Sequence, residues 1–399
     1  MRDRLRVLSI YEGFFSGGAR MLHTDAVIGL HEGGQRHRVL SIHGDMRREA
    51  TYQRMEDDAC YRSLSAAGVP VTSLGRRPPG TAGPGAFTSP ELAVTTGLTA
   101  DADVILSLKE QPIGLLNQAG PPHRPVVVCL HRSDPENQGA ALDDLKTAVA
   151  EGRIAAAVCC AASTKAAYQA AGIPAGLLHV IPNGVDLLRF RPDPVRHAAL
   201  RASLRIPSTA PVIVFAARYA AMKNVPLFLS AARSYLRQEP GGHILMCGAG
   251  MTTANPGLRA DLAAAFADEP RLTDRVSLLG VRCDMEVVYA AADVVSLTSA
   301  TGEAAPLCLI EGMMCGAVPV ATDVGDCAAM VAGHGITTPP DPETIARAWS
   351  EAAGRRAEFA PALARSRERF SRTRMIVSYS ALIDRVHRDA AEVALAEPF

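Results

Sequence analysis

The sequence has little lysine, no cysteine motif that binds zinc and no long hydrophobic run. Its nine cysteines include no C-x-x-C pair, and most lie inside short apolar stretches, so we expect buried thiols in a reducing compartment. No run of about 18 apolar residues and no N-terminal signal sequence is present, which predicts a cytoplasmic protein that neither is secreted nor spans a membrane. Because 41 basic residues balance 41 acidic ones, no net charge attracts the chain to nucleic acid or to an anionic membrane.

The sequence does contain enough apolar residues for two domain cores, since 48% of its 399 residues are hydrophobic. Short apolar runs alternate with helical stretches, a pattern that predicts parallel sheets covered on both faces. The runs are residues 4–10, 38–43, 69–74, 104–108, 126–130, 155–161 and 177–181, followed by 212–216, 243–247, 276–279, 294–297 and 318–321. The stretch 76–90, rich in proline and glycine, predicts a long surface loop, and a pair of charged amphipathic helices is expected from Ala357 onward.

Two glutamates lie in one strand–loop–helix–strand unit, residues 293–321. The helix is predicted to begin near Pro306 and to stop at Gly316. Glu303 then precedes the helix, where unpaired backbone N–H groups favour anions, and Glu311 follows one to two turns later on the same side. The alternative is a capping glutamate and a solvated helix glutamate.

This pair resembles the E-x7-E motif of retaining GT-B glycosyltransferases, particularly those of glycosyltransferase family 4. The segment Ile181–Asp186, I-P-N-G-V-D, is similar to the one that ends the N-terminal domain in that family. The resemblance implies an α/β GT-B fold with two doubly wound Rossmann-like domains that face each other across a cleft. An acceptor-binding domain is expected at residues 1–187, a linker at 188–208 and a nucleotide-sugar-binding domain at 209–368. A helix at 369–399 is expected to cross back to the first domain.

Arg218 and Lys223 lie five residues apart after the first strand of the second domain, where ligands of open α/β sheets bind. Both cations could reach a pyrophosphate, although ordinary surface charge is the alternative. Lysine is rare in this chain, which draws attention to Lys223. The pair resembles the R-x4-K pair of the family, which stabilises the departing nucleoside diphosphate.

The resemblance also implies roles for other residues. Glu303 would contact the hydroxyls of the donor sugar, Glu311 would hold the ribose, and His131, at the end of a strand, would lie near the reacting carbon. His23, His179 and His243 are instead predicted to be structural residues with satisfied hydrogen bonds. The expected catalytic residues are His131, Arg218, Lys223 and Glu303. The expected nucleotide-sugar-binding residues are Gly18, Arg218, Lys223, Gly248, Gly280, Val281, Ala305, Pro306, Leu307 and Glu311.

The chain departs from the family where Ala304 and Ala305 stand in place of the usual Gly-Phe. No D-x-D pair lies at the carboxyl end of a strand, so neither a metal nor another cofactor is expected.

The opening segment Leu8–Arg20 is similar to the second glycosyltransferases of 2-deoxystreptamine aminoglycoside pathways, of kanamycin and gentamicin type. Such an acceptor is a polycation, and carboxylates follow several strands of the first domain where it would bind. The expected acceptor-binding residues are Glu12, Gly17, Glu110, Asp134 and Glu136. The alternative for the four carboxylates is ordinary solvated loop charge.

The sequence therefore predicts a retaining glycosyltransferase that transfers a sugar from a UDP-sugar to a hydroxyl of a small acceptor. The expected acceptor is an aminoglycoside pseudodisaccharide similar to paromamine. One alternative is a UDP-sugar 2-epimerase of the same architecture. Another is a catalytically silent partner protein that binds sugar nucleotides.

Overall fold

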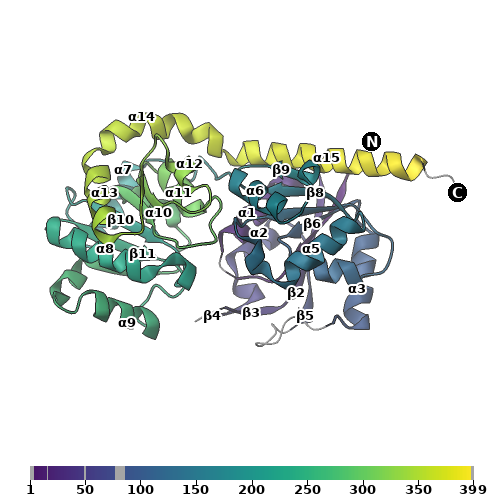
Figure 1. The fold of residues 1–399 in the computed structure, drawn as a ribbon, viewed down its shortest axis with the longest axis horizontal. Coiled ribbons are helices and arrows are strands. Elements are labelled where there is room, and N and C mark those ends of the chain that lie inside the picture. Colours follow the sequence, from purple (N-terminus) through teal and green to yellow (C-terminus); the bar gives the residue numbers. More distant parts are fainter. Residues whose placement is uncertain (1–3, 16, 49–50, 77–85, 397–399) are drawn as a thin grey trace. The chain divides into compact units, whose positions relative to one another are not determined.

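The computed structural model describes residues 4–15, 17–48, 51–76 and 86–396. The chain forms two compact units (Figure 1). Unit 1 consists of the residues up to Arg48, Tyr52–Asn183 and the C-terminal segment from Arg372. Unit 2 consists mainly of Gly184–Ser371. Each unit is built on one parallel sheet.

Unit 1 has a seven-stranded sheet in the order β5-β2-β1-β6-β7-β8-β9. Its strands are β1 Arg6–Tyr11, β2 Arg36–His43, β5 Val71–Arg76, β6 Val104–Leu108, β7 Val126–Leu130, β8 Ile154–Cys159 and β9 Leu178–Val180. Its helices are α1 Gly18–Glu32, α2 Ala59–Ala66, α3 Ser89–Ala100, α4 Ile113–Gln118, α5 Ala140–Ala150, α6 Ala162–Ala170 and α15 Arg372–Ala396. Strands β6 and β7 are buried along their whole length, which explains why they appear in the sequence as continuous apolar runs.

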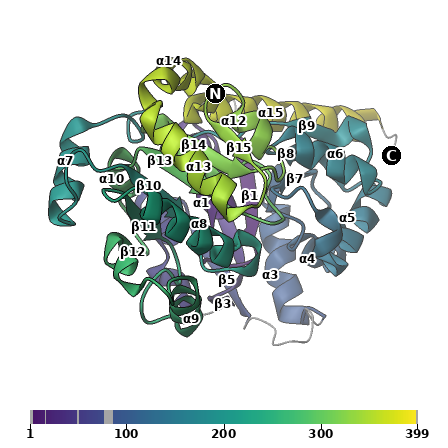
Figure 2. The ribbon, with the colours of Figure 1, turned by 60° about the vertical axis from the view of Figure 1, so that its left-hand side comes forward.

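Unit 2 has a six-stranded sheet in the order β12-β11-β10-β13-β14-β15. Its strands are β10 Val212–Ala216, β11 His243–Cys247, β12 Val276–Gly280, β13 Val294–Leu297, β14 Val318–Thr322 and β15 Ile336–Thr338. Its helices are α7 Pro194–Ser203, α8 Val225–Gln238, α9 Pro256–Ala265, α10 Met285–Ala290, α11 Leu307–Met314, α12 Cys327–Val331, α13 Pro342–Gly354 and α14 Arg356–Ser366. Figure 2 shows α13 over β14 and β15, two strands with which it packs.

Both sheets reverse their strand order once, between β1 and β6 in unit 1 and between β10 and β13 in unit 2. In open α/β sheets, ligands bind beyond the carboxyl ends of the strands at such a reversal. The topology therefore places the expected ligand-binding positions on the loops after β1, β6, β10 and β13.

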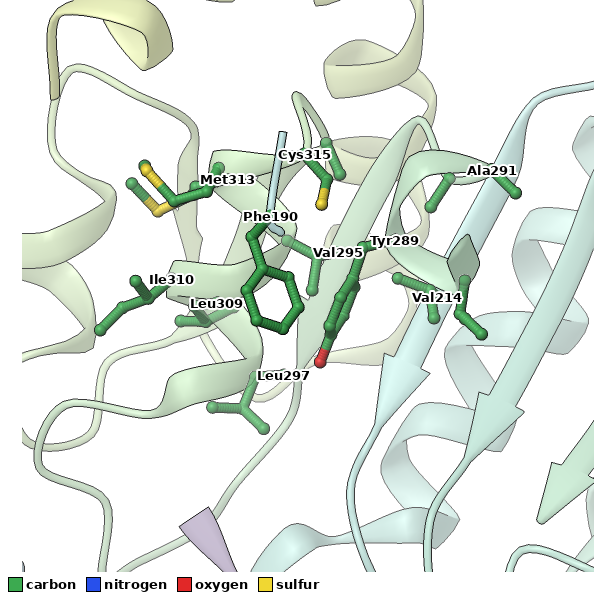
Figure 3. Close-up of a cluster of buried hydrophobic side chains, with 14 of the residues drawn as sticks. Phe190, Val214, Tyr289, Ala291, Val295, Leu297, Leu309, Ile310, Met313 and Cys315 are labelled. Carbon is green, nitrogen blue, oxygen red and sulfur yellow. The ribbon is translucent and has the colours of Figure 1, made fainter. Parts of the chain in front are cut away.

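The sheet of unit 2 separates two apolar cores. One lies under α8 and α13 and includes Phe228 and Trp349, whose indole N–H donates to Ser296 Oγ at 2.9 Å. The other lies under α10 and α11 and gathers Phe190, Tyr289 and Leu309 (Figure 3). Because both faces are filled, α10 and α11 are held firmly against the strands that carry the loops at the sheet reversal.

The predicted linker at 188–208 is wrong, because this segment belongs to unit 2 and contains α7. Pro194 takes the first helical position, where its missing N–H costs nothing, and the side chain of Asp193 caps the helix. Arg201 on α7 is buried and donates to the carbonyl of Ala291 and to the carboxylate of Asp293, which binds this segment to the sheet.

The C-terminal helix α15 belongs to unit 1 and packs beside α1. It begins at Arg372, a few residues after the predicted boundary, and donates from Arg372 to the Asp25 carbonyl at 3.0 Å. Arg374 donates to the Pro182 carbonyl at 2.7 Å. Most of the predicted loop 76–90, residues 77–85, lies outside the described residues, and Ser89 already opens α3, which Thr88 and Glu91 cap.

Candidate functional site

Lys223 and Glu303 form an ion pair where the strand order of unit 2 reverses. Lys223 follows β10 and Glu303 follows β13, so two segments 80 residues apart meet at the carboxyl edge of the sheet. Both side chains are largely buried, at 15% and 8% exposure. Burial alone would lower the pKa of the Lys223 ammonium, but the Glu303 carboxylate outweighs it and keeps that pKa above its ordinary value.

Ser299 supports the same carboxylate, since its Oγ donates to Glu303 Oε1 at 2.6 Å. Ser299 is fully buried, and its carbonyl accepts from Thr322 Oγ1 at 2.8 Å. The loop after β10 is bound to the loop after β13 by the Ala300 N–H, which donates to the Met222 carbonyl at 2.8 Å. These bonds fix the ion pair on a rigid base.

Gly325 lies against the backbone of Glu303. It has φ +62°, and a Cβ added there would overlap the Glu303 carbonyl oxygen, far inside the 3.0 Å that real Cβ atoms respect. The Asp326 N–H next to it donates to the Ala304 carbonyl at 2.9 Å. The loop after β14 therefore packs closely against the loop that carries Glu303.

Helix α11 begins at Leu307, with Pro306 before it and no side chain capping its first turn. The predicted start near Pro306 is therefore confirmed. A first turn without a side-chain cap offers backbone N–H groups to an anion. Burial raises the pKa of the Cys308 thiol in this turn to about 12. The charges of Lys223, Glu303 and Glu311 also act on this thiol, so all three side chains lie near it. The structure therefore brings the two glutamates and Lys223 around the first turn of α11.

Glu311 lies in the second turn of α11 and is 7% exposed. Burial, followed by the charge of Glu311, raises the pKa of Tyr289 on α10 well above its ordinary value. Because Glu311 is buried, the alternative that it belongs to a solvated helix face is excluded.

Arg218 lies beside this cluster, where its charge acts on Lys223 and its Nη2 contacts Met222 Sδ at 3.8 Å. Two glycines that were predicted to contact the nucleotide, Gly248 and Gly280, already donate their N–H groups to backbone carbonyls. The Gly248 N–H donates to the Gly280 carbonyl at 2.7 Å, and the Gly280 N–H donates to the Met251 carbonyl at 3.0 Å. Their backbone therefore builds the turn after β11 and β12, while the neighbouring Val281 exposes 62% of its surface.

In unit 1, His131 follows β7, and its Nε2 has no hydrogen-bond partner among the described residues. Burial, with a smaller contribution from the charge of Lys109, lowers its pKa to about 3, so the ring is neutral. Lys109 follows β6 in a left-handed conformation, φ +68°, which is uncommon outside glycine. Such a strained residue beside a half-buried histidine, with one ring nitrogen unpaired within the described residues, is typical of functional sites.

The prediction for His23 is wrong, because neither ring nitrogen has a partner within the described part of the chain. Burial, followed by the effects of His131 and Arg20, lowers its pKa to about 3. The other two predictions are confirmed. His179 Nε2 lies 3.0 Å from Arg385 Nη2, and His243 Nδ1 lies 3.0 Å from the Gly241 carbonyl.

The four predicted acceptor carboxylates differ in their surroundings. Asp134 receives two hydrogen bonds of 2.7 Å from Arg132, which outweigh its burial and hold its pKa below the ordinary value. Glu110, after β6, is almost fully buried, both of its oxygens lack partners among the described residues, and burial raises its pKa. Glu136 is exposed, and Glu12 acts electrostatically on the buried Arg20. Local arginine therefore already compensates the charge of Asp134.

Gly17 and Gly18 begin α1, and the Gly17 carbonyl accepts from the Arg20 and Met21 N–H groups. Gly17 has an extended φ of 173°, and a Cβ there would meet nothing closer than Phe15 at 3.9 Å. No neighbour within the described residues therefore requires glycine at position 17.

Ser299 and Gly325 were not expected at the site. Neither belongs to a recognisable motif, and only the folded chain shows that Ser299 donates to the Glu303 carboxylate and that Gly325 lies against the Glu303 backbone. Among the residues that the structure describes, no three His, Cys, Asp or Glu side chains gather closely enough to hold a metal ion. Each described helix is too short or too polar to cross a bilayer.

Residues 210–354 match the protein family described as glycosyl transferases group 1. A D-inositol 3-phosphate glycosyltransferase of Segniliparus rotundus is 32% identical over 157 residues, which are 39% of this chain and 34% of that protein. A GDP-mannose-dependent alpha-(1-6)-phosphatidylinositol monomannoside mannosyltransferase of Mycobacterium tuberculosis is 33% identical over 87 residues, 22% of each chain. The chain thus spans about a third or less of the length of these curated relatives.

Solved structures resemble the chain over nearly its whole length. The Anabaena protein HepE, crystallised with UDP and glucose, has a TM-score of 0.75 and 21% identity, covering 96% of this chain and 100% of HepE. Sucrose-phosphate synthase from Thermosynechococcus elongatus has a TM-score of 0.68 and 19% identity, covering 99% of this chain and 100% of that one. The predicted α/β fold class with two Rossmann-like units is confirmed, and the fold is that of GT-B glycosyltransferases.

Proposed function

We propose that the protein is a retaining glycosyltransferase that transfers a sugar from a UDP-sugar to a hydroxyl group of a small acceptor. The observation that carries this proposal is the ion pair of Lys223 and Glu303, supported by Ser299, at the sheet reversal of unit 2. The segment that contains it matches the glycosyl transferases group 1 family, and the structurally similar HepE was crystallised with UDP.

Arg218 and Lys223 are the groups that would neutralise the diphosphate. An ammonium has three N–H donors, so Lys223 can keep Glu303 and still donate to a phosphate oxygen. At an effective dielectric constant of about 20, one contact of about 4 Å between unit charges is worth about 4 kcal/mol. Only the share of this interaction energy that increases in the transition state, as negative charge develops on the departing diphosphate, accelerates the reaction.

Glu303 would accept hydrogen bonds from the sugar hydroxyls, and Glu311 from the ribose. The first turn of α11, from Ala305 and Pro306 to Leu307, would add backbone N–H donors for the phosphates. The turn that contains Gly280 and Val281 would lie beside the base. The His131 ring is neutral, and its Nε2 has no partner among the residues that the structure describes, so it suits a hydrogen bond to the sugar better than a positive charge. Gly18, at the start of α1, would allow the nucleotide sugar to approach the backbone.

For the acceptor we propose an aminoglycoside pseudodisaccharide of the paromamine type, bound at the loops after β1, β6 and β7. Glu12, Glu110, Asp134 and Glu136 lie on these loops, and Gly17 begins the adjacent helix. Since Arg132 compensates Asp134, recognition of ammonium groups would depend mainly on the other three carboxylates. Inositol phosphate is the second candidate, because the curated relatives that match are named for inositol-based acceptors.

Turnover of UDP-sugars tests the proposal with three acceptors: a pseudodisaccharide aminoglycoside, inositol 3-phosphate and a neutral glycoside. We expect transfer to the first. Transfer to inositol phosphate alone would retain the enzyme class and replace the acceptor, whereas an altered sugar formed without any acceptor would identify a 2-epimerase. Retention is read from the anomeric configuration of the product.

Lys223→Met should abolish detectable transfer and weaken UDP binding at least about 100-fold. Lys146→Met, which removes an exposed lysine on α5, is the matched control and should leave both unchanged. Equal behaviour of the two variants would contradict the proposed diphosphate site.

We also propose that the reaction needs no metal ion or other cofactor. Turnover should then survive prolonged treatment with a chelator. A cytoplasmic location agrees with the free thiols of all nine cysteines.

A further inference from the structure

The alternation of side chains along β10 continues past the end of the strand. Within β10, Phe215 belongs to the core under α8 and α13, whereas its neighbour Val214 belongs to the core under α10 and α11. Ala217 and Tyr219, which follow the strand, again pack against the core under α8 and α13. Arg218, between these two residues, is therefore directed to the opposite side, toward α11.

Backbone hydrogen bonds hold the segment 217–219 in this register. The Ala217 N–H donates to the Cys247 carbonyl at 2.9 Å, and the Tyr219 N–H donates to the Ala249 carbonyl at 2.7 Å. Donors two residues apart are typical of a parallel ladder. Gly248, between the two accepting residues, has φ +130°, and a Cβ there would lie 2.1 Å from the Ala217 carbonyl oxygen. The turn after β11 thus fits directly against the backbone on either side of the arginine.

The side chain of Tyr219 is held along its whole length. Its hydroxyl donates to Asp261 Oδ2 on α9 at 2.9 Å, and α9 packs beside α8 (Figure 1). A Cβ added at Gly257 would lie 2.7 Å from the hydroxyl oxygen, and one added at Gly250 would lie 2.9 Å from the Tyr219 Cβ. Two glycines therefore provide the space for the phenol, and Asp261 binds its end.

We propose that Tyr219 is a positioning residue that holds Arg218 on the α11 side, toward the diphosphate of the nucleotide sugar. The proposal rests on the proposed function, in which Arg218 and Lys223 bind the diphosphate. A slip of one residue would turn each side chain of an extended segment to the opposite face. The bond of Tyr219 to Asp261 opposes such a slip, because it ties the residue next to Arg218 to a helix on the other side of the sheet.

The second cation has an anchor of its own. Thr298 Oγ1, after β13, donates to the Lys223 carbonyl at 3.1 Å, and the Ala300 N–H donates to the Met222 carbonyl at 2.8 Å. Lys223 thus depends on the loop after β13, whereas Arg218 depends on α9 through Tyr219. Loss of the Tyr219 hydroxyl should therefore impair one cation only, and reduce activity less than the loss of Lys223 does.

The test compares the affinities of UDP and of uridine, which lacks the diphosphate. In the wild type, UDP should bind more tightly than uridine. In Tyr219→Phe, UDP binding should weaken about tenfold while uridine binding stays within about twofold. For turnover of the UDP-sugar, kcat should fall about tenfold and KM should change less than about threefold. The reason is that the charge of the diphosphate develops only as the sugar departs, and UDP carries that charge fully.

Variants of Asp261 show whether the hydrogen bond is responsible. Asp261→Asn keeps an acceptor oxygen and should bind both ligands as the wild type does. Asp261→Ala removes the acceptor and should reproduce Tyr219→Phe, and the double variant should be no weaker than either single one within about twofold. In an Arg218→Met background, adding Tyr219→Phe should weaken UDP binding less than about twofold further, because Tyr219 acts through Arg218.

Tyr235→Phe is the matched control. Tyr235 on α8 is fully buried, and its hydroxyl has no partner among the described residues, so the same atom is removed without loss of a bond to a carboxylate. This variant should bind UDP and uridine as the wild type does.

Equal weakening of both ligands by Tyr219→Phe, or no weakening of either, would overturn the positioning role and leave the proposed function intact. A further tenfold loss in the Arg218→Met background would do the same. A wild type that binds UDP no more tightly than uridine would overturn both. Circular dichroism and thermal unfolding show whether each variant is folded. If Tyr219→Phe is unstable, Asp261→Ala decides the question, since it removes the same hydrogen bond and keeps the phenol.

Discussion

Replacing Gly325 by alanine should disable the site without removing any functional side chain. Gly325 has φ +62°, and alanine in that conformation costs about 1–2 kcal/mol. The new Cβ would also overlap the carbonyl oxygen of Glu303 and must displace it by about 1 Å, a misplacement that can reduce catalysis about 100-fold. Because the moved backbone carries Glu303, its side chain would lose the alignment set by Lys223 and Ser299.

Gly333→Ala separates the two effects. Gly333 has a similar φ of +75°, but a Cβ there meets nothing within 4 Å. Both variants should lose a similar part of their stability from the backbone conformation, which thermal unfolding measures. Only Gly325→Ala should also lose about 100-fold in kcat/KM for UDP-sugar turnover. If the kcat/KM values of the two variants agreed within about threefold, the close approach of Gly325 to Glu303 would have no catalytic importance.

Two further variants test the surroundings of the predicted residues. Ser299→Ala removes the 2.6 Å hydrogen bond to Glu303 and should lower kcat about tenfold with UDP affinity unchanged in a titration; an equal loss of UDP affinity would contradict a role at the sugar. Glu110→Gln should raise the melting temperature at about pH 8 and leave it unchanged at about pH 4. Burial raises the pKa of Glu110, so its contribution to stability is complete below its ordinary value of 4.5 and is lost as the pH rises through the raised value. Glutamine stays neutral throughout, and equal melting temperatures at about pH 8 would refute this account.

The sheets were predictable because their strands are apolar along most of their length. Val126–Leu130 and Val212–Ala216 have the same bounds in the sequence prediction and in the structure. The segment 188–208 was misjudged because its prolines and arginines have the composition of a linker. Its burial depends on contacts such as that of Arg201 with Asp293, 92 residues away, which no local pattern reveals.

In the candidate site, too, some features could be predicted from the sequence and others only from the tertiary structure. The sequence by itself determined which residue types follow which strand, and so placed Lys223, Glu303 and Glu311 in recognisable motifs. Only the tertiary structure decided that Lys223 pairs with Glu303, that Ser299 donates to the same carboxylate, and that Arg132 compensates the charge of Asp134. The physical reason is that spacing along the chain fixes strands and helix starts, whereas the partner of a buried charge is fixed by which distant segments the packed sheet brings within hydrogen-bond distance.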